Sequence, residues 1–337
     1  MERPCPVLRN KGHISGIVMR LPIKKQHLTA LLAGALPFLF GASSEDALEP
    51  QTFQDCKSCP EMVVIPEGQV QIGSHLDEIG RKKGERKQVM AKIANPFAMA
   101  ATEVTLSQFR VFMEETGYKS NVPVYKGEPL VGCNYYDGKG YGYIAEHNWK
   151  NPGYPQREDA PVVCVSWSDA TAYAAWLSKK TGRSYRIPSA VEFEYASRAG
   201  SSAPWFWGTD PAKACDYANI GDRTLADTYP KRPSFPCDDG YLYTAPVKRF
   251  KPNAFGLYDM VGNAWEWAND CFVPNLDTMP TTGISDEGTE EECTFRTPKG
   301  GSWISGISWS RAAVRSRDGA DYKSFMLGFR VAAAVEK

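Results

Sequence analysis

The chain has 337 residues, of which 42% are hydrophobic and 12% aromatic, enough apolar material for a packed core, so wholesale disorder is excluded. Its 39 Lys and Arg residues balance 39 Asp and Glu residues, and with no long basic stripe we expect no nucleic-acid partner. Nine cysteines point either to metal ligation or to disulfides in an oxidising compartment.

The N-terminal region favours export. Lys24 and Lys25 precede an apolar run from Leu28 to Ala42, which is too short to span a bilayer but fits the apolar region of a secretory signal. We therefore predict a signal peptide at residues 1–44, with Met19 as an alternative start, and a periplasmic or secreted protein with no membrane span after cleavage. The alternative is an anchor that is never cleaved. Cleavage would remove six basic residues and one acidic residue, leaving a mature net charge of −5.

Eight cysteines remain after such a cleavage, and an even number in an exported protein indicates disulfides. The first two, Cys56 and Cys59, could instead form half of a zinc site or a redox motif, but the second half of a zinc site and the strand-helix setting of a redox motif are both missing. Proximity along the chain suggests four sequential pairs, which are Cys56–Cys59, Cys133–Cys164, Cys215–Cys237 and Cys271–Cys293.

An exposed lead-in is expected at residues 45–60, followed by the first regular elements. Met62 to Pro66 and Gln69 to Ile72 have the composition of strands, and Gly68 between them is a typical turn residue. The charged segment from Arg81 to Lys87 is expected to be a solvated loop.

Three capping boxes predict helices, because in each a Ser or Thr is followed three residues later by Gln, Asp or Glu. The helices are expected to run from Thr105 to Gly117, from Ser166 to Gly182 and from Ser189 to about Gly200. Long loops at about 121–160 and 201–300 need disulfides or bound cations to order them. The pattern predicts an α+β fold, a single irregular and loop-rich domain over residues 61–337, low in regular secondary structure and stapled by disulfides.

Seven motifs carry a resemblance to a known family. They are Met62-Val-Val-Ile-Pro-Glu-Gly68, Thr102-Glu-Val-Thr105, Pro161-Val-Val-Cys-Val-Ser-Trp-Ser-Asp-Ala170, Arg186-Ile-Pro-Ser-Ala-Val-Glu-Phe-Glu-Tyr195, Asn253-Ala-Phe-Gly-Leu-Tyr-Asp-Met-Val-Gly-Asn-Ala-Trp-Glu-Trp267, Lys299-Gly-Gly-Ser-Trp303 and Gly328-Phe-Arg-Val331. In this order and spacing the chain resembles the formylglycine-generating enzyme family, also called sulfatase-modifying factors, from about residue 60 to the C-terminus. The resemblance implies an irregular α+β domain related to C-type lectins.

The resemblance is incomplete at the residues that carry the family's activity. Formylglycine-generating enzymes have two redox cysteines shortly after a Gly-Gly-Ser-Trp motif, and these thiols hold copper and permit oxygen-dependent oxidation of a substrate cysteine. Aligned from Gly300 to Trp303, the two positions fall on Ser305 and Ser310. Because a serine hydroxyl is a poor ligand for copper(I) and forms no disulfide, we predict that this protein does not generate formylglycine and do not expect copper.

Iron is not expected either, because only His75 and His147 survive signal cleavage, whereas related sulfoxide synthases bind iron through three histidines. A site of two histidines and a carboxylate stays open.

The resemblance implies two structural calcium ions held by side-chain and backbone oxygens. In the second site the segment from Asp259 to Glu266 would wrap two carboxylates around a glycine turn. The alternative at either site is an acidic loop held by water or a salt bridge. The implied ligands are Asn219, Ile220, Asp239 and Tyr241 for the first site, and Asp259, Gly262, Ala264 and Glu266 for the second.

A substrate groove is expected near residues 302–317, although most tryptophans should be core. The two arginines at strand spacing there would face the same way and could pair with an anionic substrate, or with Glu192 or Glu194. The residues expected to line the groove are Ser302, Trp303, Trp309, Arg315 and Arg317.

Two functions are compatible with these features. The first is an exported oxidoreductase or maturation factor for a peptide, a protein or a peptide-derived small molecule. A periplasmic branch of the family without the cysteine pair oxidises a siderophore precursor during pyoverdine maturation, and the resemblance extends to it. The second is a non-catalytic, lectin-like binding or assembly module in the periplasm.

Overall fold

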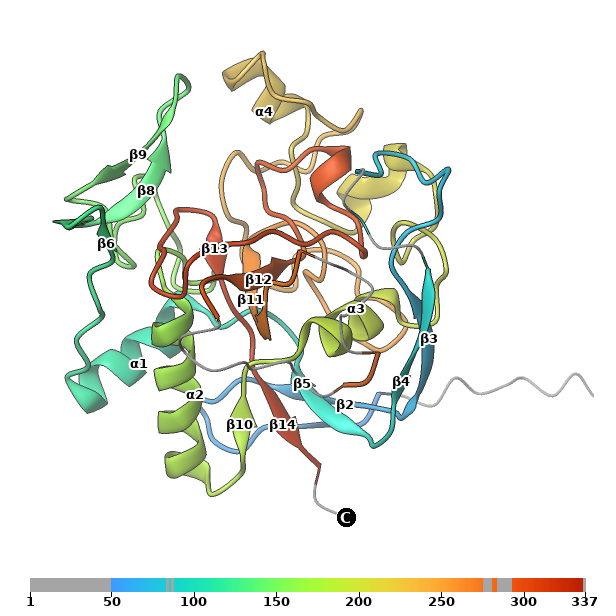
Figure 1. The fold of residues 1–337 in the computed structure, drawn as a ribbon, viewed down its shortest axis with the longest axis horizontal. Helices are drawn as coiled ribbons and strands as arrows, with labels where there is room; N and C mark the ends of the chain where they lie inside the picture. Colours follow the sequence, from blue (N-terminus) through green and yellow to red (C-terminus); the bar gives the residue numbers. More distant parts are fainter. Residues whose placement is uncertain (1–49, 83–84, 86–87, 275–280, 284–292, 336–337) are drawn as a thin grey trace, which may run out of the picture. The chain divides into compact units, whose positions relative to one another are not determined.

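The computed structural model describes residues 50–335, except 83–84, 86–87, 275–280 and 284–292 (Figure 1). The predicted signal peptide lies outside the described residues. No helix of the described part has the length and apolar character needed to cross a membrane.

A five-stranded antiparallel sheet joins the two ends of the domain. Its order is β1-β2-β5-β14-β10, and in Figure 1 it lies at the bottom of the view, with β10 beside the helix α2. The C-terminal strand β14 thus pairs between β5 and β10. The strands are β1 (Thr52–Phe53), β2 (Met62–Ile65), β5 (Phe97–Ala100), β14 (Ala332–Ala334) and β10 (Tyr185–Arg186).

The three predicted helices are confirmed, and each begins at its capping box. They are α1 (Leu106–Thr116), α2 (Trp167–Thr181) and α3 (Ala190–Arg198). Gly117 and Gly182 end the first two in the left-handed conformation, which glycine adopts at little cost. Phe112 of α1 packs against Tyr173 of α2 with ring centroids 5.6 Å apart, so the helices share one aromatic core.

A substitution tests the second capping box. The hydroxyl of Ser166 accepts a hydrogen bond from the backbone N–H of Asp169 at 3.1 Å, and the Asp169 carboxylate accepts from the Ser166 N–H at 2.9 Å. Ser166→Ala is expected to destabilise the protein by about 1 kcal/mol, because it leaves a buried helix N–H unsatisfied. Urea unfolding would measure the change. Lys179→Ala, exposed in the last turn of α2, is the matched control and should change stability by under about 0.5 kcal/mol.

A smaller sheet and three hairpins complete the strands. In the smaller sheet, β11 (Trp265–Cys271) pairs antiparallel with β12 (Arg296–Lys299) and parallel with β13 (Leu327–Gly328). The hairpins are β3 (Gly68–Ile72) with β4 (Val89–Ile93), β6 (Val124–Tyr125) with β7 (Glu128–Pro129), and β8 (Cys133–Tyr136) with β9 (Tyr141–Ile144). The remaining helical segments are η1 (Pro211–Asp216), α4 (Arg223–Thr228) and η3 (Ile307–Trp309). The predicted α+β class and irregular, loop-rich architecture are confirmed.

All four disulfides connect the cysteines that chain proximity paired. Cys56–Cys59 closes the turn before β2, and Cys133–Cys164 joins β8 to the segment before α2. Cys215–Cys237 joins η1 to the loop after α4, and Cys271–Cys293 joins the end of β11 to the segment before β12. The disulfides therefore hold the long loops that lack regular structure of their own.

Three local expectations differ from the structure. Residues 50–60 are mostly exposed, but β1 adds a strand to the large sheet and Cys59 is buried. Gly68 begins β3 instead of forming a turn, and a Cβ there would come within 2.6 Å of the Tyr195 hydroxyl. The prediction of a solvated loop at 81–87 was wrong for Glu85, whose carboxylate pairs with the buried guanidinium of Arg311.

Candidate functional site

A cavity of about 230 Å³ lies beside the first of the two serine positions. Its walls come from segments far apart in sequence: the β8–β9 hairpin, the loop after α4, β11, and the loops on either side of η3. In Figure 1 the β8–β9 hairpin and α4 both project on the upper side of the view. The lining residues are Tyr141, Arg232, Trp265, Ile304, Ser305, Trp309, Ser316 and Met326.

The fold brings Ser305 and Ser310 together, but their hydroxyls are used in hydrogen bonds. The Ser305 hydroxyl accepts from the Ser302 N–H at 3.0 Å, and the Ser310 hydroxyl donates to the Ser305 carbonyl at 3.1 Å. Gly301 makes the turn possible, since its φ is +84° and a Cβ would come within 2.7 Å of the Trp309 carbonyl. Both serines are buried, and neither offers the soft thiolate that copper(I) requires.

Of the other residues expected in the groove, Trp309 lines the cavity and Ser302 lies behind it. The Ser302 hydroxyl is buried and lies 3.6 Å from the sulfur of Met326, which does line the cavity. Trp303 is in the core, where its ring packs edge-on against Tyr154 and Tyr243.

The two arginines expected in the groove lie against other aromatic rings. Arg315 donates to the Val273 carbonyl at 2.7 Å and stacks on Phe272, and Arg317 lies near the same ring. The carboxylates proposed as their partners are bound elsewhere. Glu192 pairs with Arg186, and Glu194 pairs with Arg198 and Lys299.

Three buried carboxyl groups gather at the residues of the second implied calcium site. Glu266 is fully buried and accepts two hydrogen bonds from Arg330, at 2.6 and 2.7 Å. Asp259 accepts from the Lys248 N–H with Oδ2, while its Oδ1 is buried without a partner in the described chain. Glu103, which the sequence did not assign to this site, is buried too, and both of its oxygens lack a hydrogen-bond partner among the described residues.

Electrostatics explains why this cluster suits a cation. Burial, together with repulsion from Asp259 and Glu266, raises the pKa of Glu103 well above its usual range. Burial also raises the pKa of Asp259 to about 6. Arg330 supplies one positive charge against three carboxyl groups, so a divalent oxygen-bound ion would offset the remaining charge and satisfy the orphaned oxygens. The second donor set therefore offers calcium the unpartnered oxygens of Glu103 and Asp259, whereas both oxygens of Glu266 are also held by Arg330, the salt bridge that was the expected alternative.

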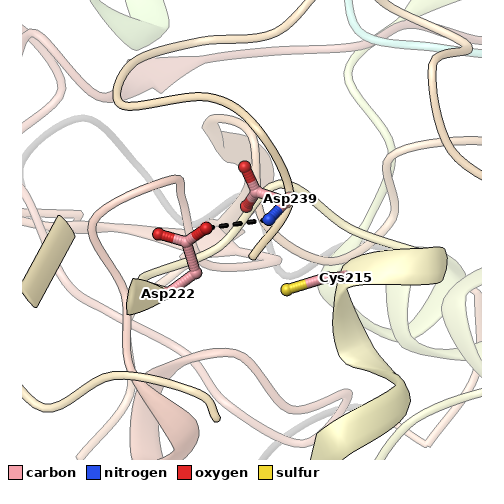
Figure 2. Close-up of side chains that lie close together, drawn as sticks. All are labelled: Cys215, Asp222 and Asp239. Carbon is pink, nitrogen blue, oxygen red and sulfur yellow. Dashed lines mark hydrogen bonds between the residues drawn. The ribbon is translucent and has the colours of Figure 1, made fainter. Parts of the chain in front are cut away.

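The first implied calcium site also contains a buried oxygen without a hydrogen-bond partner in the described chain, and two carboxylates that repel each other, Asp222 and Asp239 (Figure 2). Asn219 Oδ1 is buried without a partner in the described ranges. Asp239 accepts from the backbone N–H groups of Ile220 and Tyr241, and its own N–H donates to Asp222 at 2.8 Å. Burial, with added repulsion from Asp222, raises the pKa of Asp239 to about 7.

The fit at the first site is weaker, because both Asp239 oxygens already accept hydrogen bonds. Cys215 lies in the same cluster, with its sulfur and the carboxylate oxygens of Asp222 and Asp239 all within 4.8 Å of one another. Its sulfur is bonded to Cys237, so it offers no thiolate to a metal. Asp222 is a carboxylate that the sequence did not place here.

The two histidines occupy unrelated environments. His75 is exposed next to Asp77, and His147 packs edge-on against Tyr135. The one group of three potential His, Cys, Asp or Glu ligands within the described ranges contains neither histidine.

Several residues at the cavity were not predicted from the sequence, and three of them are polar or charged groups outside the motifs. Tyr141 and Arg232 line it, and Asp318 accepts a hydrogen bond from the lining Ser316 at 3.4 Å. Burial raises the pKa of Asp318 to about 7. None belongs to the seven motifs, and no spacing pattern in the sequence links them, because they meet only through the tertiary fold.

Comparisons with known proteins agree with the fold and the motifs. The family described as sulfatase-modifying factor enzyme 1-like domain matches residues 48–335. The formylglycine-generating enzyme of Bos taurus is 32% identical over 297 residues, 81% of this chain and 74% of that protein, and the enzyme of Thermomonospora curvata is 31% identical over 81% and 93%. The inactive C-alpha-formylglycine-generating enzyme 2 of Mus musculus is 28% identical over 82% of this chain and 86% of its own.

A solved structure is similar over nearly the same length. PvdO from Pseudomonas aeruginosa has a TM-score of 0.70 and 35% identity, covering 85% of this chain and 99% of that one. Treponema denticola variable protein 1, at 19% identity, a TM-score of 0.59 and 85% and 99% coverage, shares the fold.

Proposed function

The chain belongs to the sulfatase-modifying factor family of formylglycine-generating enzymes, and on that basis we propose that it is an exported maturation enzyme that does not itself generate formylglycine. Its substrate in this proposal is a peptide, a protein or a peptide-derived small molecule, oxidised in the cavity beside Ser305. The periplasm, or secretion, is the proposed location. A relative named as inactive supports the idea that this fold is retained without that activity.

The observation that carries the proposal is the aromatic cavity beside Ser305. The cavity is present and Trp265 and Trp309 line it, so a substrate group can be enclosed. The hydroxyls of Ser305 and Ser310 are bound to neighbouring main-chain groups and lack the acidity and softness of thiols. The site therefore keeps the shape of a substrate pocket and lacks the thiols that would hold copper there.

Calcium is the proposed cofactor, and its role is structural. Glu103, Asp259 and Glu266 would hold it at the second site, where it supplies positive charge and fixes the loop before β11. These residues form a cluster distinct from the eight that line the cavity, so the ion would stiffen the scaffold and take no part in the reaction.

Proton transfer in this proposal belongs to Asp318. Its pKa of about 7 lets it both accept and release a proton near neutral pH, and Ser316 connects it to the cavity. The oxidant would have to be supplied by oxygen or by a separate redox partner.

The alternative is a binding or assembly module, and the buried, hydrogen-bonded serines favour it. A direct experiment separates the two functions. Metal analysis of purified mature protein is combined with oxygen uptake in the presence of candidate peptides. Uptake that needs the cavity supports the enzyme, whereas calcium alone with no uptake supports the module and contradicts the oxidoreductase.

A separate prediction concerns the family's own reaction. A sulfatase-type peptide containing the substrate cysteine is expected to remain unmodified when incubated with this protein, copper and oxygen, because Ser305 and Ser310 cannot bind the metal. Mass spectrometry would detect the aldehyde by its mass difference. A formylglycine-generating enzyme assayed in parallel controls the peptide, and appearance of the aldehyde with this chain would overturn the prediction.

A further inference from the structure

Arg232 is a cation in the cavity wall without an acidic partner. Its guanidinium lies against the adjacent rings of Tyr136 and Tyr141, 4.2 and 5.5 Å from their centroids, and donates a hydrogen bond to the Tyr141 hydroxyl. No ion pair to Asp or Glu involves it in the described part of the chain, and the residue is only partly exposed. The two rings and the Tyr141 hydroxyl hold the guanidinium in place, and no carboxylate of the described chain neutralises its charge.

The other lining residues add no negative charge. They are aromatic, aliphatic or hydroxyl-bearing, so Arg232 is the one charged residue among the eight that line the cavity. A second basic group lies close by, since the half-buried amine of Lys82 rests over the Trp309 ring without a hydrogen-bond partner in the described ranges. Burial lowers the pKa of Lys82 to about 7, so it carries only part of a positive charge at neutral pH. Glu85, the nearby carboxylate, is bound to Arg311.

The carboxyl group of Asp318 accepts a hydrogen bond from Ser316, which lines the cavity. Because burial raises its pKa to about 7, it carries a reduced negative charge at neutral pH. Lys82 and Asp318 therefore offset each other in part, and Arg232 supplies the charge in a wall that is otherwise aromatic, aliphatic or hydroxyl-bearing.

We propose that Arg232 binds a carboxylate of the ligand, and that the cavity takes an anionic group attached to a ring or apolar side chain. A guanidinium forms strong, charge-assisted hydrogen bonds with a carboxylate, and Trp265 and Trp309 provide the surface for the apolar part. At about 230 Å³ the cavity is smaller than most ligand sites, so it holds one end of a peptide or peptide-derived molecule and leaves the remainder outside.

The identification of this ligand as the substrate rests on the proposed function, but the binding does not. The test uses two probes of equal shape, N-acetyl-L-phenylalanine and its uncharged amide, titrated into the purified, calcium-supplemented protein by calorimetry. The acid is expected to bind about tenfold more tightly than the amide, and Arg232→Gln is expected to remove that preference. Arg232→Lys should retain part of it, because the charge stays and the planar fork is lost.

Lys231→Gln is the matched control. It removes the same charge at the neighbouring position, and Lys231 is not among the residues that line the cavity. It should leave the preference for the acid within about twofold. The methyl NMR signal of Met326, assigned with Met326→Leu, should shift with the acid probe because Met326 lines the cavity. Thermal melts show whether each variant is folded. If Arg232→Gln is unfolded, a weaker preference for the acid in Arg232→Lys and a decrease of acid binding with added salt test the inference instead.

Equal binding of acid and amide, equal loss in Lys231→Gln and Arg232→Gln, or no binding of either probe would each overturn the inference. Acid binding without oxygen uptake on any peptide would keep it and contradict the proposed oxidation. Oxygen uptake on neutral substrates, with no preference for the acid probe, would support the proposed oxidation and contradict the carboxylate site at Arg232.

Discussion

Arg330→Met is expected to destabilise the protein by about 3–5 kcal/mol, because it leaves buried carboxylates without their counter-charge. Arg330 is fully buried and donates two hydrogen bonds to Glu266. It also donates to the carbonyls of Ala100 and Tyr258, which tie β5 to the loop before β11. Chemical denaturation of the variant and the wild type, both with calcium, measures the difference.

The control for this variant is an exposed ion pair of the same chemistry. Arg157 pairs with Asp159 at 2.8 Å on the surface, and Arg157→Met should cost less than about 1 kcal/mol. Adding Glu266→Gln to Arg330→Met should recover part of the loss in calcium-free buffer at neutral pH, because it removes a carboxylate that has lost its counter-charge. A cost of less than 1 kcal/mol for Arg330→Met would show that the buried cluster is not charged as described.

Removal of calcium is expected to lower the melting temperature markedly. An ion present at a thousand times its dissociation constant stabilises the native state by about 4 kcal/mol, and a chelator removes that contribution. Glu103→Gln should reduce the calcium-dependent increase more than Asp77→Asn, an exposed carboxylate outside both clusters. Differential scanning calorimetry with EGTA and with added calcium measures this. An unchanged melting temperature would contradict both calcium assignments.

The direction of the pH dependence follows from the raised pKa values. Asp259 and Asp239 have pKa values of about 6 and 7 in the native protein, against about 3.9 for an unfolded Asp. Between these values the native state binds more protons, so the stability of the calcium-free protein falls as pH rises from about 4 to 7. Calcium competes with those protons. The calcium-dependent gain in melting temperature should therefore be larger at pH 8 than at pH 5.5.

Local sequence patterns were sufficient for the helices and disulfides. The capping boxes at Thr105, Ser166 and Ser189 depend on residues three apart, and each begins a helix in the structure. The disulfides followed chain order, which works when each bridge closes a single loop. Local patterns failed at Gly68 and at Glu85. In both cases the deciding neighbour, Tyr195 or Arg311, lies more than a hundred positions away.

The candidate site also contains residues that local sequence patterns located and residues that they did not. The motif containing Gly300 and Gly301 placed Ser305 at the cavity and Ser310 in hydrogen-bond contact with it, because the turn and the two positions are close in sequence. Trp303 belongs to the same motif, but whether a ring faces the core or the cavity depends on what packs against it. Arg232, from the loop after α4, could not be anticipated at all.

The sequence by itself determined the family, the helix starts and the absence of the redox cysteines, since each depends on residue identity and short spacings. It suggested the disulfide pairs from chain proximity, and the structure established them. Only the tertiary structure decided which charges are paired. Glu103 joins Asp259 and Glu266 in one buried cluster, and Arg232 reaches the cavity with no carboxylate of the described residues beside it, because folding brings together segments that are distant along the chain. Burial then changes their pKa values and leaves charge to be balanced, which no residue pattern records.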